Sequence, residues 1–139
     1  MSDLDRLRDF AKRYTAAWCS RNAASVAAHY SPEGSLTINN GTPAVGRNAI
    51  TAAAQDFMTA FPDMRVQLDD IRIQNDRATF HWTLEGTNTG PGGTGHRVRI
   101  SGFEEWELDA NGLIAESQGH FDESSYNRQL KYGFEGAQR

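Results

Sequence analysis

The feature that most constrains the fold is a change in the spacing of apolar residues at Met64. Before it, apolar residues recur at helical spacing. The first such set is Leu4, Leu7, Ala11, Tyr14 and Trp18. After Met64, apolar and polar residues alternate with a period of two, which is typical of strands buried on one face. Helices followed by a run of antiparallel strands predict an α+β fold.

The expected elements follow from this spacing and from the turn residues between them. The predicted helices cover about residues 3–20, Ala23–Tyr30, a third that opens at Gly46-Arg47-Asn48 and ends at Phe61-Pro62-Asp63, and Ser124–Tyr132. The predicted strands are Ser35–Asn39, a stub at Ala44–Val45, Arg65–Ile73, Arg77–Thr89, His96–Asp109 and a last strand ending at Asp122. We also expect Ser2 to cap the first helix, a hairpin turn at Gln74-Asn75-Asp76, and a bulge or bend at Gly102.

The overall composition excludes several classes of protein. A chain of 139 residues predicts one domain over residues 1–139. The net charge of −4 and the lack of a Lys/Arg cluster argue against a nucleic-acid or anionic membrane partner. A lone cysteine, Cys19, allows no internal disulfide and fits a reducing compartment. The N-terminus has no apolar signal core, and no apolar run is long enough to span a membrane, so we expect a cytoplasmic protein.

Motifs for common cofactors are missing from the sequence. The segment Gly90–Gly95 is rich in glycine, but no Gly-Lys-Ser/Thr follows it, so it predicts a flexible hairpin loop and not a phosphate loop. The four histidines lack the close pairing of a metal site, and Cys19 stands alone. The sequence therefore predicts neither a metal nor another cofactor.

The last predicted strand carries a set of polar residues on one face. In the stretch Gly112–Leu130, one register holds Ser117, Gly119 and Phe121, and the other holds Gln118, His120 and Asp122. If the second register faces a cavity, its amide, imidazole and carboxylate form a polar group at the end of an apolar pocket. If it faces water, it is simply the polar face of a strand.

The chain resembles a SnoaL-like polyketide cyclase domain of the nuclear transport factor 2-like superfamily, from about Leu7 to Leu130. The matching segments are Ala17-Trp18, Tyr30-Ser31-Pro32-Glu33-Gly34, Gly46-Arg47-Asn48-Ala49-Ile50, Phe61-Pro62-Asp63, Gly86-Thr87-Asn88-Thr89-Gly90, Asn111-Gly112-Leu113-Ile114-Ala115-Glu116, Phe121-Asp122 and Gln129-Leu130. The resemblance implies a cystatin-like α+β barrel, in which a cone-shaped, curved antiparallel or mixed sheet wraps around the N-terminal helices. It also implies a homodimer that forms through the sheet.

The resemblance implies a function as well. In the cyclases of this family an aspartate at the end of the last strand is the general acid/base of an intramolecular aldol closure, without metal or cofactor, and Asp122 matches it. His120 or Gln118 is expected to orient this carboxylate or to bind an enolate oxygen. The expected pocket residues are Tyr14, Trp18, Phe57, Phe61, Trp106 and Gln118. Tyr14 and Trp18 have an alternative interpretation as core aromatics.

The sequence departs from the family pattern in Phe103-Glu104-Glu105-Trp106-Glu107-Leu108, where Trp106 and Leu108 stand in place of polar partners. Two hypotheses therefore remain open. The first is an enzyme, an aldol-type cyclase or isomerase, that acts on a small apolar molecule with a carbonyl group. The second is a non-catalytic ligand-binding or dimerisation module of the same fold.

Overall fold

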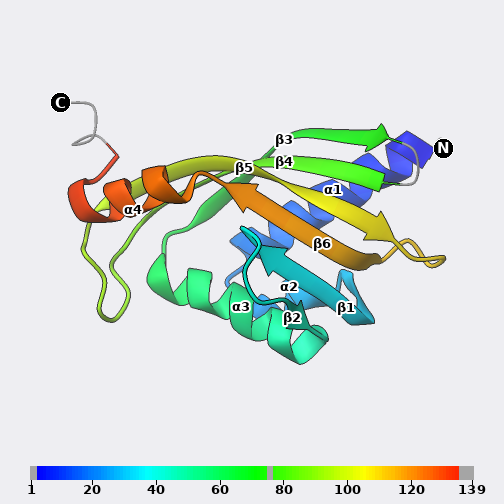
Figure 1. The fold of residues 1–139 in the computed structure, drawn as a ribbon, viewed down its shortest axis with the longest axis horizontal. Helices are drawn as coiled ribbons and strands as arrows, with labels where there is room; N and C mark the ends of the chain where they lie inside the picture. The colour runs from blue at the N-terminus through cyan, green and yellow to red at the C-terminus, as the bar shows by residue number, and fades with distance from the viewer. Residues whose placement is uncertain (1–2, 75–76, 135–139) are drawn as a thin grey trace.

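The computed structural model describes residues 3–74 and 77–134 of the chain (Figure 1). The helices are α1 (Asp3–Cys19), α2 (Ala23–Ala27), α3 (Arg47–Ala60) and α4 (Glu123–Tyr132). The strands are β1 (Tyr30–Ile38), β2 (Ala44–Val45), β3 (Arg65–Gln74), β4 (Arg77–Thr87), β5 (Arg97–Leu108) and β6 (Ile114–Phe121). The α+β class predicted from the change of period is confirmed.

The six strands form one mixed sheet in the order β2-β1-β6-β5-β4-β3. Strand β1 runs parallel to β6, and every other neighbouring pair is antiparallel. The sheet is curved but open, since β2 and β3 are edges that do not pair with each other. Helices α1 and α3 lie on its concave side, and α4 follows directly from the end of β6 (Figure 1).

The core fills the space between the helices and the concave face of the sheet. Helix α1 contributes its apolar stripe, including the fully buried Tyr14, because residues three and four apart share one helix face. The Tyr14 ring meets Trp106 of β5 edge-on at 5.2 Å, and Phe80 of β4 stacks on Trp106 at 5.0 Å. Aromatic contacts of this kind add to the stability gained by burial alone. They fix α1 against the middle of the sheet.

The structure corrects the boundary between the second helix and the first strand. The predicted helix Ala23–Tyr30 ends earlier, at Ala27, and the strand predicted from Ser35 begins earlier, at Tyr30, so the segment 31–34 belongs to β1. The pairing of β1 with β6 shifts register between Tyr30 and Ser35. A proline is tolerated in a strand at such an irregularity, because it need not donate to the ladder there.

Of the bulge or bend expected at Gly102, the bulge is wrong. Pairing of β5 with β4 continues without a shift through Gly102, and the shift against β6 lies between Glu107 and Leu108. The predicted cap at Ser2 and most of the turn at residues 74–76 lie outside the described residues. Within the described ranges, none of the helices has the length and apolar character needed to cross a membrane.

Candidate functional site

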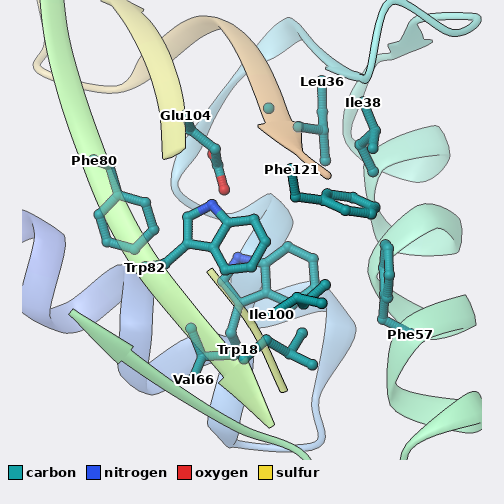
Figure 2. A pocket seen from close by; sticks show the side chains of 12 residues that line it. Trp18, Leu36, Ile38, Phe57, Val66, Phe80, Trp82, Ile100, Glu104 and Phe121 are labelled. Atoms are coloured by element: carbon teal, nitrogen blue, oxygen red, sulfur yellow. The ribbon is translucent and has the colours of Figure 1, made fainter. Parts of the chain in front are cut away.

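A cavity of about 60 Å³ lies between the concave face of the sheet and helices α1 and α3 (Figure 2). In the described part of the chain, its wall is formed by apolar side chains, one glycine and one charged residue, Glu104. The lining residues are Trp18, Leu36, Ile38, Phe57, Val66, Phe80, Trp82, Leu84, Ile100, Glu104, Gly119 and Phe121. Such a wall, with a single convergent polar group, is the usual make-up of a small-molecule site.

Glu104 is buried in the middle of β5 and is held by side chains from its own strand, from β6 and from α1. Its Oε1 accepts hydrogen bonds from Trp106 Nε1 at 2.9 Å, Ser117 Oγ at 2.7 Å and the Tyr14 hydroxyl at 3.0 Å. Trp106 lies two residues after Glu104 in β5, so the two side chains are on the same face of the strand. Ser117 lies on the adjacent strand β6, directly opposite Trp106. Burial of a carboxylate is tolerated here because these donors replace water.

Burial raises the pKa of the Glu104 carboxyl above its usual value of 4.5, and the hydrogen bonds that it accepts offset this only in part. A carboxylate with a raised pKa is a stronger base than an exposed one. Proton exchange with a bound molecule therefore becomes easier near neutral pH.

Two tyrosine hydroxyls extend this network away from the cavity. The Tyr14 and Tyr30 hydroxyl oxygens lie 2.8 Å apart, and both side chains are fully buried. Burial raises the pKa of each hydroxyl well above 10.0, and the nearby Glu104 charge raises it further. Both groups therefore stay protonated, and the chain Tyr30–Tyr14–Glu104 supplies donors to the carboxylate.

The two oxygens of Glu104 are unequally engaged. Oε1 accepts the three hydrogen bonds given above. Oε2 has a longer contact of 3.3 Å from the same Tyr14 hydroxyl, and the Tyr30 hydroxyl also interacts with the carboxylate. Since the Tyr14 hydroxyl has one hydrogen, Oε2 has the greater capacity to accept a bond from a molecule in the cavity.

Comparison with known proteins identifies the family. The SnoaL-like domain matches residues 11–117, most of the chain. The chain belongs to the SnoaL-like domain family. The resemblance predicted from the sequence is thereby confirmed. No curated protein matches this SnoaL-like domain.

Solved structures share the fold of this SnoaL-like domain at low sequence identity. A protein with a ketosteroid isomerase-like fold from Catenulispora acidiphila, in complex with trimethylamine, is 15% identical with a TM-score of 0.78, and the match covers 88% of this chain and 92% of that one. TsrD from Streptomyces laurentii is 22% identical with a TM-score of 0.79 over 94% and 98% of the two chains. A protein from Jannaschia sp., provisionally assigned as a SnoaL-like polyketide cyclase, is 16% identical with a TM-score of 0.67 over 82% and 86%.

The structure of this SnoaL-like domain places Asp122 on the surface. Its side chain is exposed and caps helix α4, where Oδ1 accepts a hydrogen bond from the Ser125 backbone N–H at 3.0 Å. It lies outside the cavity lining described above. The catalytic role suggested for Asp122 stays a prediction, and the geometry gives this residue a capping role.

The polar register of β6 lies on the convex face of the sheet. Gln118 Nε2 donates to Glu116 Oε1 at 2.7 Å, and His120 Nε2 lies 3.2 Å from Glu105 Oε1. The other register, with Ser117, Gly119 and Phe121, faces Glu104 and the cavity. His120 and Gln118 are therefore separated from the cavity by the sheet itself.

The predicted pocket residues fall into three groups in this SnoaL-like domain. Trp18 and Phe57 line the cavity. Tyr14 and Trp106 do not line the cavity, but each donates a hydrogen bond to the Glu104 carboxylate. Phe61 is fully buried and packs against Tyr126 of α4 at 6.4 Å, beyond the lining.

Glu104 is the residue that the sequence analysis missed. The signal that could have found it is the period of two, because Glu104 shares a strand face with Trp106, which was expected in the core or pocket wall. An acidic residue on the same strand face as a buried tryptophan is itself a candidate for burial. Buried acids are rare unless they are paired or functional.

Proposed function

We propose that this SnoaL-like domain is an enzyme that performs general acid–base chemistry, without a cofactor, on a small and mostly apolar carbonyl compound. Glu104 is the group that exchanges the proton. The observation that carries the proposal is that, among the residues that the structure describes, Glu104 is the one charged residue in an otherwise apolar cavity wall. The likeness to a SnoaL-like polyketide cyclase supports an aldol-type ring closure or an isomerisation as the reaction class.

The chemistry needs a base next to an acidic C–H bond. Oε2 of Glu104 removes a proton from the carbon beside the carbonyl, and the C–H electron pair becomes an enolate. In a ring closure, the enolate carbon attacks a second carbonyl of the same molecule. The Glu104 carboxylic acid then returns its proton to the new alkoxide. The raised pKa of Glu104 suits both steps, because one group must first accept and then donate the proton.

The size of the cavity limits what enters it. Its volume of about 60 Å³ is well below the roughly 300–1,000 Å³ of pockets that enclose a drug-sized ligand. Phe57, Trp82 and Phe121 line it and are partly exposed, so they form an apolar mouth. In this proposal the reacting carbonyl end of the substrate lies beside Glu104, and the remainder packs on the mouth.

Hydrogen–deuterium exchange tests the proposal directly. Cyclic ketones and 1,3-diketones are incubated in D₂O with the protein, and loss of the C–H signal beside the carbonyl is followed by NMR. The variant Glu104→Gln keeps the shape of the side chain, and its amide oxygen can still accept the hydrogen bonds that Oε1 accepts in the wild-type protein. We expect this variant to lose about 10²- to 10⁴-fold in the exchange rate, the usual contribution of a positioned base.

Two matched variants serve as controls. Glu105→Gln changes the neighbouring acid, which lies on the convex face, and Asp122→Asn changes the acid predicted from the sequence. Both should retain the wild-type exchange rate. A wild-type exchange rate in Glu104→Gln, or a lost exchange activity in Asp122→Asn, would contradict the role proposed for Glu104.

A non-catalytic ligand-binding module is the second candidate. The favouring observation is the saturation of Oε1, which is what a purely structural buried carboxylate would show. In that case the protein binds apolar molecules without altering them, and Glu104→Gln binds them equally well. Detection of any chemically changed product with the wild-type protein argues against this candidate.

We further propose that the protein acts as a homodimer joined through the convex face of the sheet. Phe103 is partly exposed there, between His81 at 5.8 Å and His120 at 4.9 Å measured between ring centroids. This face lies opposite the helices that cover the concave side. An aromatic group on an uncovered sheet face supports contact with a second copy of the chain.

A further inference from the structure

The Trp82 indole nitrogen is a buried donor that has no hydrogen-bond partner among residues 3–74 and 77–134. Among the described residues, Trp82 Nε1 and His120 Nε2 are the buried side-chain nitrogen or oxygen atoms that make no hydrogen bond. His120 Nε2 still lies 3.2 Å from the Glu105 carboxylate, whereas Trp82 Nε1 belongs to a residue of the cavity wall. An unpaired buried donor is rare in folded proteins, because its lost hydration is not replaced.

The sheet register places Trp82 beside Glu104. On the β4–β5 pair, Trp82 lies opposite Gly102, and Phe80 lies opposite Glu104. Trp82 and Glu104 are therefore diagonal neighbours on one sheet face, a separation that long side chains can bridge. Figure 2 shows the indole nitrogen of Trp82 on the side of its ring that faces the Glu104 carboxyl.

The position of the indole is fixed by its surroundings. A Cβ atom added at Gly102 would lie 2.7 Å from Trp82 Cζ2, so the indole rests directly over this glycine. The Phe121 ring meets it edge-on at 6.1 Å. A donor held in this way is preorganised, and binding to it costs little ordering of the side chain.

We infer that the Trp82 N–H binds the carbonyl oxygen of the substrate while Glu104 Oε2 contacts the acidic C–H or enol O–H next to it. This inference deepens the proposed function and rests on it in taking the same cavity as the site. An N–H aimed at the carbonyl oxygen stabilises the negative charge that develops there as the enolate forms. The substrate class is thus a compact ketone or 1,3-dicarbonyl whose polar atoms lie on one edge and whose remaining surface is apolar.

Cyclopentanone and its hydrocarbon counterpart cyclopentane are the probes for a test. The chain has three tryptophans, so a ¹H–¹⁵N spectrum of the protein contains three indole N–H signals, and the signal missing in Trp82→Phe assigns Trp82. We expect cyclopentanone to move the Trp82 indole proton downfield, as a new hydrogen bond does, and cyclopentane to leave it near its original position.

Affinity gives a second readout. Trp82→Phe keeps an aromatic ring and removes the N–H, so cyclopentanone should bind about three- to tenfold more weakly while cyclopentane binding is unchanged. Trp18→Phe is the matched control, since it removes an indole from the same wall and should affect both probes alike. Should Trp82→Phe fail to fold, the Trp82 signal is assigned by its nuclear Overhauser contacts with the Phe121 ring, and its downfield shift in the wild-type protein still decides the question.

The same titration in Glu104→Gln separates this inference from the proposed function. A Trp82 shift that persists in that variant, together with loss of deuterium exchange, supports both. A persistent shift with unchanged exchange supports the Trp82 site and overturns the role of Glu104. If cyclopentanone does not bind, or binds wild-type protein and Trp82→Phe equally, or leaves the indole signal unmoved at saturation, the inference is overturned.

Discussion

At the scale of single residues, Glu104 shows what a buried carboxylate needs, since its donors take the place of water. It is only 7% exposed, and its carboxylate is supported by three side-chain donors on one oxygen. Removing the whole side chain would leave those donors unsatisfied, at a cost of about 1–3 kcal/mol for each buried group. The isosteric Glu104→Gln is therefore the informative variant, since it removes the charge and keeps an acceptor.

The stability of the protein should depend on pH through Glu104. Its pKa in the folded state lies above the usual 4.5, because burial disfavours the charge. The group therefore stabilises the fold fully below about pH 4.5, and this contribution is lost as the pH rises through the raised pKa. Urea unfolding between about pH 4 and about pH 8 should show Glu104→Gln gaining in stability relative to wild type as the pH rises. A difference that stays constant with pH would contradict the raised pKa.

Tyr14 links α1 to the carboxylate, and its hydroxyl should matter for stability. Tyr14→Phe removes a donor to Glu104 and the 2.8 Å contact with the Tyr30 hydroxyl. We expect a loss of about 1–3 kcal/mol in the free energy of unfolding, measured by urea denaturation. Tyr132→Phe removes a hydroxyl from a side chain that is 56% exposed and should change stability by less than about 0.5 kcal/mol. Equal effects in the two variants would show that the buried network adds nothing.

The residue scale is also where sequence reasoning was weakest. The period of two separated the registers of the last strand, but it could not tell which register faces the cavity. The answer depends on the partner strand, because Ser117 lies opposite Trp106 and reaches Glu104. Asp122 ends the strand and becomes the cap of α4 instead, a role that its position just before a helix also fits.

At the scale of elements, most of the prediction followed from apolar spacing and turn residues. Helices α1 and α3, the stub β2 and the long strands β4 and β5 lie close to where the sequence placed them. The start of β1 could not be predicted in this way. The composition of residues 31–34 is that of a turn, and only pairing with distant β6 makes this segment part of a strand.

Two glycines on neighbouring strands should behave differently when replaced by alanine. In Gly102→Ala the new methyl carbon would lie 2.2 Å from the His120 carbonyl oxygen and 2.7 Å from the Trp82 ring. Strands β5 and β6 must then move apart, at a cost of about 1–3 kcal/mol. In Gly119→Ala the nearest atom, Glu104 Cγ, is 3.6 Å away, an ordinary contact.

The measurement is urea unfolding of both variants alongside probe binding. We expect Gly102→Ala to lose stability and Gly119→Ala to remain within about 0.5 kcal/mol of wild type. Because Gly119 lines the cavity, its added methyl group should nevertheless weaken cyclopentanone binding. Equal stability of the two variants would contradict the close approach of β5 and β6 at Gly102.

At the scale of the whole molecule, the sheet separates two kinds of surface. Its concave face carries the aromatic core, the cavity and Glu104, and its convex face carries His81, Phe103 and His120. The α+β class followed from element order and spacing, whereas the family followed from the resemblance of the quoted motifs. The sequence could not decide which face carries the polar residues of β6, although Gln118 and His120 were named as site residues, because curvature is a property of the assembled sheet and is not encoded in any one strand.

The proposed dimer should depend on the side chains at the convex face of the sheet. Phe103 lies between two imidazole rings on this face, so Phe103→Asp would place a charge at the centre of the proposed contact and beside Glu105. Burying an unpaired carboxylate there is costly, and the variant should be monomeric in analytical ultracentrifugation while wild-type protein is a dimer.

Val45→Asp is the matched control, since Val45 is an apolar residue that is 62% exposed on edge strand β2, and it should stay dimeric. A monomeric wild type would overturn the proposed dimer, and a dimer that survives in Phe103→Asp would place the contact elsewhere. Far-UV circular dichroism of each variant shows that the fold is kept, so that a change in sedimentation reports the interface alone.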